Sequence, residues 1–302
     1  MAKKKIIIEA RVNEYTMRDK NPNIPWTPDE LARESAQCRE AGASVFHFHG
    51  RTADGAADLS YGTFKEIVGK VRAASDVLIQ PTLGVWVQDS DPTERLGNII
   101  ALTADGLRPD FAPIDMGSTN VDLLNDAGTE FINEQHTDGT VYVNPTSTLK
   151  LFAEKLREIS VKPYLHIWNG PQVRLSGVFY RMGLLDGPLW MGLSHSGESA
   201  PIHHPATVAG LEAYLAMIPT GVPVEWTVNA YGANILALAR RAVELGGHVS
   251  VGIGDYAYPE LGTPHNVDLI RAVVGIAAEY GREVATPEEA REILGVAKAI
   301  AR

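Results

Sequence analysis

Two histidines separated by a single residue, His47 and His49, are the strongest indication of chemistry in this sequence. They end the run Val45-Phe46-His47-Phe48-His49, in which a β-strand would point alternate side chains to opposite faces. Both imidazoles would then share one face, and two neutral imidazoles at this spacing are good ligands for Zn²⁺ or a similar divalent metal ion. The alternative is a pair of histidines held by hydrogen bonds in a polar region.

A metal ion needs a third protein ligand, and Glu9 is a candidate. It lies in the apolar run Ile6-Ile7-Ile8-Glu9-Ala10, where an ionised carboxylate costs free energy unless it is paired or coordinated. The alternative is a salt bridge from Glu9 to Arg11 or Arg51. The sequence leaves both interpretations open.

Asp255 is the third residue with a specific chemical interpretation. It follows an apolar run together with Gly252 and Gly254, and glycines let the backbone approach a ligand closely. A carboxylate there could act as a base near a metal-bound carbonyl compound. The alternative is that Asp255 is the N-cap of a helix.

Other polar residues stand at the ends of predicted strands or just after them, and each is weaker evidence for a second layer of the site or for substrate contacts. They are Thr82, Asp115, Ser118, His166, Asn169, His195, Glu225 and Asn229. His195 is interpreted equally well as a substrate contact or as a structural loop residue. His203 and His204 precede a proline, and we expect them to be structural rather than metal ligands.

Short β-like runs alternate with amphipathic helical patterns along the chain and would position these residues. The predicted strands are 5–12, 44–49, 77–82, 111–116, 163–168, 189–194, 222–229 and 248–252. The predicted helices are 28–41, 61–74, 92–104, 147–159, 172–182, 205–217, 232–245 and 267–280, with a final helix at 287–300.

Strict alternation of strand and helix predicts parallel strands joined by crossovers. Because no Gly-x-Gly-x-x-Gly pattern follows the first strand, we predict one TIM-type (β/α)₈ barrel spanning residues 1–302, with the final helix added, rather than a doubly wound sheet. Catalytic groups of such barrels lie at the carboxyl ends of the strands. The long irregular region 117–146 is predicted to be a loop at the barrel mouth.

Composition excludes several classes of protein. The formal net charge of −10 argues against a nucleic-acid-binding surface. No apolar stretch approaches the length of a membrane span, and the lysines at positions 3 to 5 lead directly into a β-like run rather than a signal peptide. The lone Cys38 cannot form an intrachain disulfide. We therefore expect a cytoplasmic enzyme without membrane or nucleic-acid partners.

A family resemblance is carried by five segments in order. They are Ile24-Pro25-Trp26-Thr27-Pro28-Asp29-Glu30, His47-Phe48-His49 after Ala41-Gly42-Ala43, Asp115-Met116-Gly117-Ser118, Gly252-Ile253-Gly254-Asp255 after Gly246-Gly247-His248-Val249, and Gly281-Arg282-Glu283-Val284-Ala285-Thr286-Pro287. With these motifs the chain resembles the β-keto acid cleavage enzymes, typified by 3-keto-5-aminohexanoate cleavage enzyme. The resemblance covers most of the chain.

The resemblance implies a Zn²⁺-dependent barrel that condenses a small β-keto acid with acetyl-CoA to give acetoacetate and a new acyl-CoA. It implies that Asp255 takes part in proton transfer. It further implies that small hydroxyl and backbone donors hold the substrate carboxylate, at positions that match Thr82, Gly84, Ser118 and Thr119. It also implies a homotetramer or homodimer.

Three active-site positions depart from the family pattern. Gly254 stands where the family has a glutamate that is the third zinc ligand, and Ser250 stands where it has an arginine that pairs with the aspartate. His166, expected to contact the substrate, stands where a glutamate is usual. Glu9, at a position that is usually small and neutral, or His166 could supply the missing ligand.

These departures keep two alternatives open. One is a metal-assisted lyase or hydrolase of oxo-acids that does not use CoA. The other is a barrel that binds a small ligand without catalysis, which would gain stability from the ligand but show no turnover.

Overall fold

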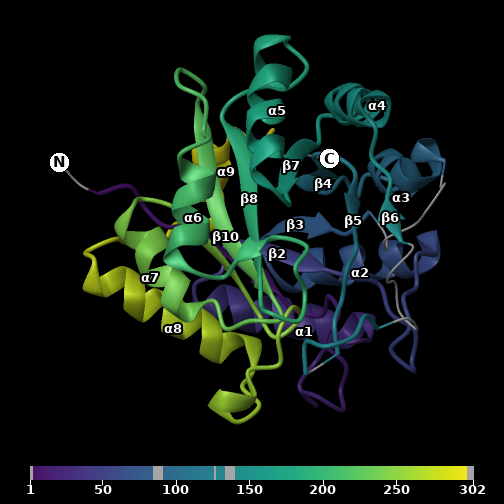
Figure 1. The fold of residues 1–302 in the computed structure, drawn as a ribbon. Helices are drawn as coiled ribbons and strands as arrows, with labels where there is room; N and C mark the ends of the chain where they lie inside the picture. Colours follow the sequence, from purple (N-terminus) through teal and green to yellow (C-terminus); the bar gives the residue numbers. More distant parts are fainter. Residues whose placement is uncertain (1–2, 84–90, 126, 133–139, 298–302) are drawn as a thin grey trace.

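Eight parallel strands form the centre of the computed structural model, which describes residues 3–83, 91–125, 127–132 and 140–297 (Figure 1). These strands are β1 (Ile8–Arg11), β2 (Val45–Phe48), β3 (Leu78–Pro81), β4 (Phe111–Asp115), β7 (Lys162–Ile167), β8 (Leu189–Ser196), β10 (Val224–Tyr231) and β11 (His248–Val251). Their order in the sheet is β3-β2-β1-β11-β10-β8-β7-β4, which is chain order around a ring.

The ring is closed between β3 and β4 by Asp110. Its backbone nitrogen donates to the carbonyl oxygen of Ile79 at 3.0 Å. The backbone nitrogen of Ile79 donates in turn to the Asp110 carboxylate at 2.9 Å. The near-closed barrel confirms the predicted (β/α)₈ fold, and each predicted strand is present at its expected place.

Helices surround the strands (Figure 1), as expected when crossovers cover a parallel sheet. They are α1 (Pro28–Ala41), α2 (Tyr61–Ala74), α3 (Pro92–Ala104), α4 (Thr146–Glu158), α5 (Gly170–Arg181), α6 (Val208–Leu215), α7 (Leu236–Glu244), α8 (Asn266–Glu279) and α9 (Pro287–Leu294). The first three have the predicted bounds. Thr27, for example, caps α1 in a capping box with Glu30, directly before Pro28.

Three helices are shorter than predicted. Helix α7 begins at Leu236 rather than residue 232 and ends at Glu244 rather than residue 245. The bounds of the other two have local causes. Helix α6 begins at Val208 rather than residue 205, because the Thr207 side chain accepts from the Gly210 backbone and fixes the N-cap there. Helix α9 ends at Leu294 rather than residue 300. Gly295 follows it with φ 63, a left-handed conformation that terminates a helix.

The apolar core has two layers separated by the strands. Phe46, Phe48 and the buried Cys38 belong to the outer layer between the strands and the helices. The inner layer fills the amino-terminal end of the barrel with one residue from each of several strands, and it packs against Ala290 and Leu294 of α9. Helix α9 therefore closes the bottom of the barrel, and polar groups are left to the opposite end.

The region predicted as a mouth loop contains additional structure. Strands β5 (Thr119–Asn120) and β6 (Val141–Tyr142) form an antiparallel pair within it. A further short strand, β9 (His204–Pro205), pairs with β8 outside the ring. In the part of the chain that the structure describes, no helix has both the length and the apolar character needed to cross a bilayer.

Candidate active site

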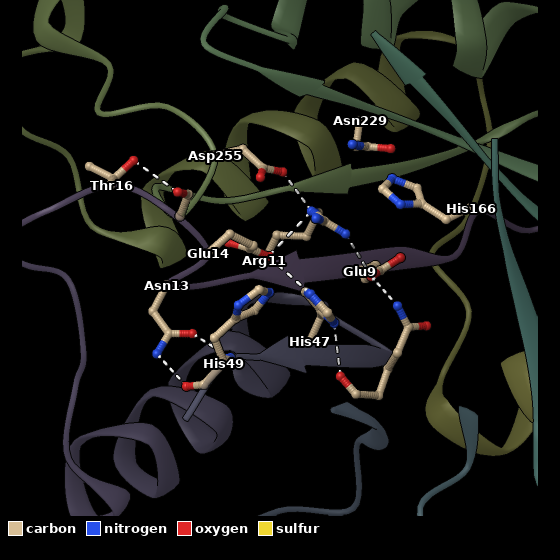
Figure 2. A network of polar contacts seen from close by, with 12 residues as sticks. Glu9, Arg11, Asn13, Glu14, Thr16, His47, His49, His166, Asn229 and Asp255 are labelled. Carbon is tan, nitrogen blue, oxygen red and sulfur yellow. Dashed lines mark hydrogen bonds and ion pairs between the residues drawn. The ribbon is translucent and has the colours of Figure 1, made fainter. Parts of the chain in front are cut away.

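His47 of β2 and His49, directly after it, lie close to Arg11 in a network of polar residues (Figure 2). The two rings line one cavity, and their centroids are 5.2 Å apart. His47 lies beside Arg11 of β1 in the sheet register. The neighbouring Phe46 and Phe48 point the other way, into the outer core. Strand alternation thus separates an apolar face from a face that carries both imidazoles.

Both imidazoles are neutral near pH 7. Burial, reinforced by the charge of Arg11, lowers the pKa of His47 well below its usual range and the pKa of His49 to about 3. Nδ1 of His47 lies 2.9 Å from the carbonyl oxygen of Gln80. Because a carbonyl only accepts, Nδ1 carries the proton and Nε2 keeps its lone pair. This is the orientation that second-layer contacts give to a metal-binding histidine.

Arg11 is the centre of a buried cluster of charges above the two rings (Figure 2). Its Nε lies 2.6 Å from Oδ2 of Asp255 and 3.3 Å from Oε1 of Glu14, and its Nη1 lies 3.7 Å from Oε1 of Glu9. Three buried carboxyl groups therefore share one guanidinium. Such a site has an excess of acidic groups and suits an additional cation.

The two glutamates of this cluster, Glu9 and Glu14, both have raised pKa values. Burial raises the pKa of Glu14, and the negative charge of the neighbouring Asp255 raises it further, to about 8. Burial also raises the pKa of Glu9 to about 7, although Arg11 acts in the opposite direction. A metal ion bound next to these groups would displace their protons.

Glu9, predicted as a metal ligand or as a partner of Arg11, makes the second kind of contact. It is fully buried, and besides Arg11 its Oε1 accepts from Nε2 of Gln80 at 3.1 Å. In the sheet register it lies beside Val45, which is two residues before His47. Glu9 is thus one layer deeper in the barrel than the two imidazoles.

Asp255 lies after β11, where the sequence places it, and the N-cap interpretation is wrong. Helix α8 begins only at Asn266 and is capped by His265. The Asp255 carboxylate instead pairs with Arg11, which lines the cavity. Asp255 does not itself line the cavity and is linked to it by its ion pair with Arg11.

The opposite wall of the cavity is a hydrogen-bonded chain from β4, β7 and β8. Nδ1 of His166 lies 2.8 Å from Oδ1 of Asp115, which also accepts from Nε1 of Trp168 at 2.7 Å. Nε2 of His166 contacts the Ser194 hydroxyl. The other Asp115 oxygen accepts from the Tyr142 hydroxyl at 2.9 Å. His166 is thereby fixed against the cavity, where it was expected to contact the substrate.

The Asp115 carboxyl is strongly held in its charged form. Burial would raise its pKa, but hydrogen bonds from His166 and Trp168 and the charge of Arg95 together hold it at about 2. Replacing Asp115 by asparagine should therefore lower the free energy of unfolding by about 2 kcal/mol at neutral pH, at roughly 1.4 kcal/mol per pKa unit.

The pH dependence of this loss follows from its sign. A carboxyl group whose pKa is lowered on folding stabilises the protein at pH values above its pKa in the unfolded chain, which is near 4. This contribution is lost as the pH falls toward the folded pKa of about 2. Urea unfolding of both proteins should show the difference about halved near pH 3. A difference that does not change with pH would contradict the assignment.

The residues expected to hold the substrate carboxylate are only partly brought together. Thr82 lines the cavity. Ser118 and Thr119 do not belong to its lining; the Ser118 hydroxyl accepts from the Asn144 backbone at 2.8 Å, and the Thr119 hydroxyl donates to the carbonyl of Asn120. Gly84 lies outside the described residues.

Of the remaining histidines, His195 is buried, and its Nδ1 lies 3.3 Å from the carbonyl oxygen of Asn229. Its ring is edge-on to Tyr214, away from the cavity lining. This favours the structural interpretation. His203 packs on Trp168, with ring centroids 4.6 Å apart.

Sequence reasoning missed several residues of the site, among them Arg11, Glu14, Tyr15 and Gln80. Arg11, Tyr15 and Gln80 line the cavity, and Glu14 contacts both Arg11 and His47. A signal for Glu14 and Tyr15 was present, because they follow the first predicted strand at its carboxyl end. Arg11 was considered only as a possible partner of Glu9.

The fold and the site define an enzyme of the α/β-barrel class, with its polar groups gathered at the carboxyl ends of parallel strands. The sequence model of the beta-keto acid cleavage enzyme family matches residues 5–296, and the chain belongs to this family.

Relatives with established names agree with this assignment. The chain is 33% identical over 298 residues to the 3-keto-5-aminohexanoate cleavage enzyme of Acetoanaerobium sticklandii, covering 97% of this chain and 99% of the relative. It is 26% identical to the 3-oxoadipate:acetyl-CoA acetyltransferase of Cupriavidus necator, covering 91% and 89% of the two chains.

A solved structure shares the fold. The binary complex of ObcA with oxaloacetate superposes with a TM-score of 0.70 at 14% identity, covering 92% of this chain and 68% of that one. At this identity the likeness supports the barrel fold alone.

Proposed function

We propose that this enzyme transfers acyl groups between a small β-keto acid and acetyl-CoA, with a divalent metal ion, Zn²⁺ for preference, held by His47 and His49. In the overall reaction the bond between C2 and C3 of the keto acid breaks. The C2 carbon with its carboxylate joins the acetyl group as acetoacetate, and the remaining acyl group leaves on CoA. The observation that carries the proposal is the inward-facing pair of neutral imidazoles in a chain of this family.

The residues present suit such a metal ion. Two neutral imidazoles on one face are borderline-soft ligands that Zn²⁺ prefers. The adjoining cluster of three carboxyl groups around Arg11 supplies negative charge for a dication. Oε2 of Glu9 and both carboxyl oxygens of Glu14 accept no hydrogen bond in the part of the chain that the structure describes. When bound, the metal supplies Lewis-acid polarisation of the keto carbonyl.

The protein's own groups would orient the substrate and move protons. Thr82, which lines the cavity wall, would donate to the substrate carboxylate. Arg11 presents a guanidinium to the cavity and holds Asp255 at 2.6 Å. Asp255 is the candidate for accepting the C2 proton. His166, fixed by Asp115 and Ser194, would contact the acyl end of the substrate.

An assay for CoA ester formation tests this function. We expect zinc-loaded enzyme to convert at least one small β-keto acid and acetyl-CoA into acetoacetate and the matching acyl-CoA, both identified by mass spectrometry. Reactions without acetyl-CoA are the control. Turnover of oxo-acids without CoA would favour a lyase or hydrolase, and thermal stabilisation by keto acids without turnover would favour a non-catalytic binder.

A further inference from the structure

A side chain at position 254 would overlap the side chain of Glu14 at the mouth of the barrel. A Cβ on Gly254 would lie 1.6 Å from Oε2 of Glu14 and 2.5 Å and 2.6 Å from the backbone nitrogens of Glu14 and Asn13. Gly254 is not among the glycines with positive φ. Close approach, rather than backbone conformation, therefore requires glycine here. The space that a side chain at position 254 would occupy is filled by the Glu14 carboxylate.

The Glu14 carboxylate is unsatisfied as it stands. Its side chain is 1% exposed, and in the described part of the chain neither oxygen accepts a hydrogen bond. Nε of Arg11, 3.3 Å from Oε1 of Glu14, donates instead to Asp255 at 2.6 Å. A buried carboxylate without donors is costly and calls for a partner of another kind.

Another polar neighbour of this carboxylate is the unprotonated ring nitrogen of His47. Oε1 of Glu14 lies 3.6 Å from Nε2 of His47, the nitrogen that keeps its lone pair. Two ligand atoms of a tetrahedral ion with bonds of about 2.0–2.2 Å are themselves about 3.3–3.6 Å apart. Once Glu14 has lost its proton, both atoms are acceptors, so a cation between them would satisfy both.

We propose that Glu14, from the segment after β1, is the third protein ligand of the metal ion held by His47 and His49. This inference rests on the metal site of the proposed function. The resemblance would place the third ligand at position 254, after β11. In this chain the segment after β1 would supply it instead. The described residues do not hold three such side chains preassembled in ligand geometry, so metal binding would have to bring His49 and Glu14 closer together.

A second exchange between the same two strands supports the first. By the resemblance, Ser250 of β11 stands where an arginine is expected. In the sheet register it lies beside Glu9 of β1. The guanidinium that pairs with Asp255 comes instead from Arg11 of β1. The two side chains that the resemblance leads us to expect at positions 250 and 254 would thus be replaced from β1 and the segment that follows it. Glu9 is the weaker ligand candidate, because it lies deeper and is engaged by Gln80.

Glu14→Gln and Glu9→Gln form a matched pair for the test. Each variant replaces one buried carboxyl group of the Arg11 cluster by an amide of nearly the same shape, so both should fold, as circular dichroism of the metal-free proteins would verify. Zinc affinity would be measured by competition with a chromogenic chelator and zinc content by elemental analysis. The visible spectrum of the Co²⁺-loaded proteins would report the ligand set.

We expect wild type and Glu9→Gln to bind one zinc with the same Co²⁺ spectrum. The affinity of Glu9→Gln should be only slightly lower, because Glu9 lies deeper and would add charge but no bond to the ion. Glu14→Gln should bind zinc on the order of 100-fold more weakly, the upper end of what even indirect ligand contacts are worth, with an altered Co²⁺ spectrum. Glu14→Ala provides a second measurement if the glutamine variant is poorly folded.

Two results would overturn the inference while the metal site itself stands: equal zinc affinity in wild type and both variants, or a loss confined to Glu9→Gln. Failure of the wild type to bind zinc would overturn the metal site of the proposed function together with this inference. The two failures are therefore distinguishable in one set of titrations.

Discussion

Replacing either histidine of the pair, as His47→Ala or His49→Ala, should abolish stoichiometric zinc binding and nearly all acyl transfer. A Lewis acid at a carbonyl contributes several kcal/mol, and roughly 1.4 kcal/mol corresponds to a factor of ten, so kcat/KM should fall by about 10³-fold or more. The direct measurements are metal content by elemental analysis and the rate of acyl-CoA formation at saturating zinc.

A buried histidine outside the cavity is the matched control. His195→Ala removes an imidazole from β8 that contacts the Asn229 carbonyl and does not line the cavity. Its zinc content should equal that of the wild type. If His47→Ala and His49→Ala retained one tightly bound zinc and full activity, the site would have to lie elsewhere in the chain.

The position of this histidine pair could be predicted because it depends on local pattern. Alternation along β2 decides which side chains share a face, and alternation of strands and helices decides which strand ends meet. The same kind of signal located the strands and placed Asp255 and His166 at the mouth. Two of the errors at helix ends, at the start of α6 and the end of α9, arose from single capping residues, Thr207 and Gly295.

The roles of Arg11 and Glu14 could not be predicted in this way. They depend on how β1 and β11 are aligned, and the register of two parallel strands far apart in the chain is not encoded in a local pattern. The role of Glu14 depends further on an absent side chain, because only a glycine at 254 leaves room for the carboxylate. A glycine in one sequence carries no information about what fills its space. Ser118 and Thr119 show the opposite kind of error. They are close to Asp115 in sequence and were expected in the site, but they do not belong to the cavity lining.

Replacing Arg11 by methionine should lower the free energy of unfolding of the metal-free protein by about 3–5 kcal/mol, the usual cost of removing one partner from a buried ion pair. The side chain is 7% exposed, and Glu9, Glu14 and Asp255 would lose their shared cation. Urea unfolding is the measurement. Arg240→Met is the control, since its ion pair with Glu279 is half exposed and should be worth less than about 1 kcal/mol.

The size of the Arg11 effect should depend on pH and on zinc, and both dependences follow from the charges it balances. With folded pKa values of about 7 for Glu9 and about 8 for Glu14, both groups are protonated below these values and need little compensation. The cost of Arg11→Met should therefore increase as pH rises from about 6 to about 9. Saturating zinc should reduce the cost at the upper end of this range, because a dication beside Glu14 takes over part of the compensation. An equal loss at every pH, with and without zinc, would mean that Arg11 stabilises the barrel through packing rather than through the carboxylates around it.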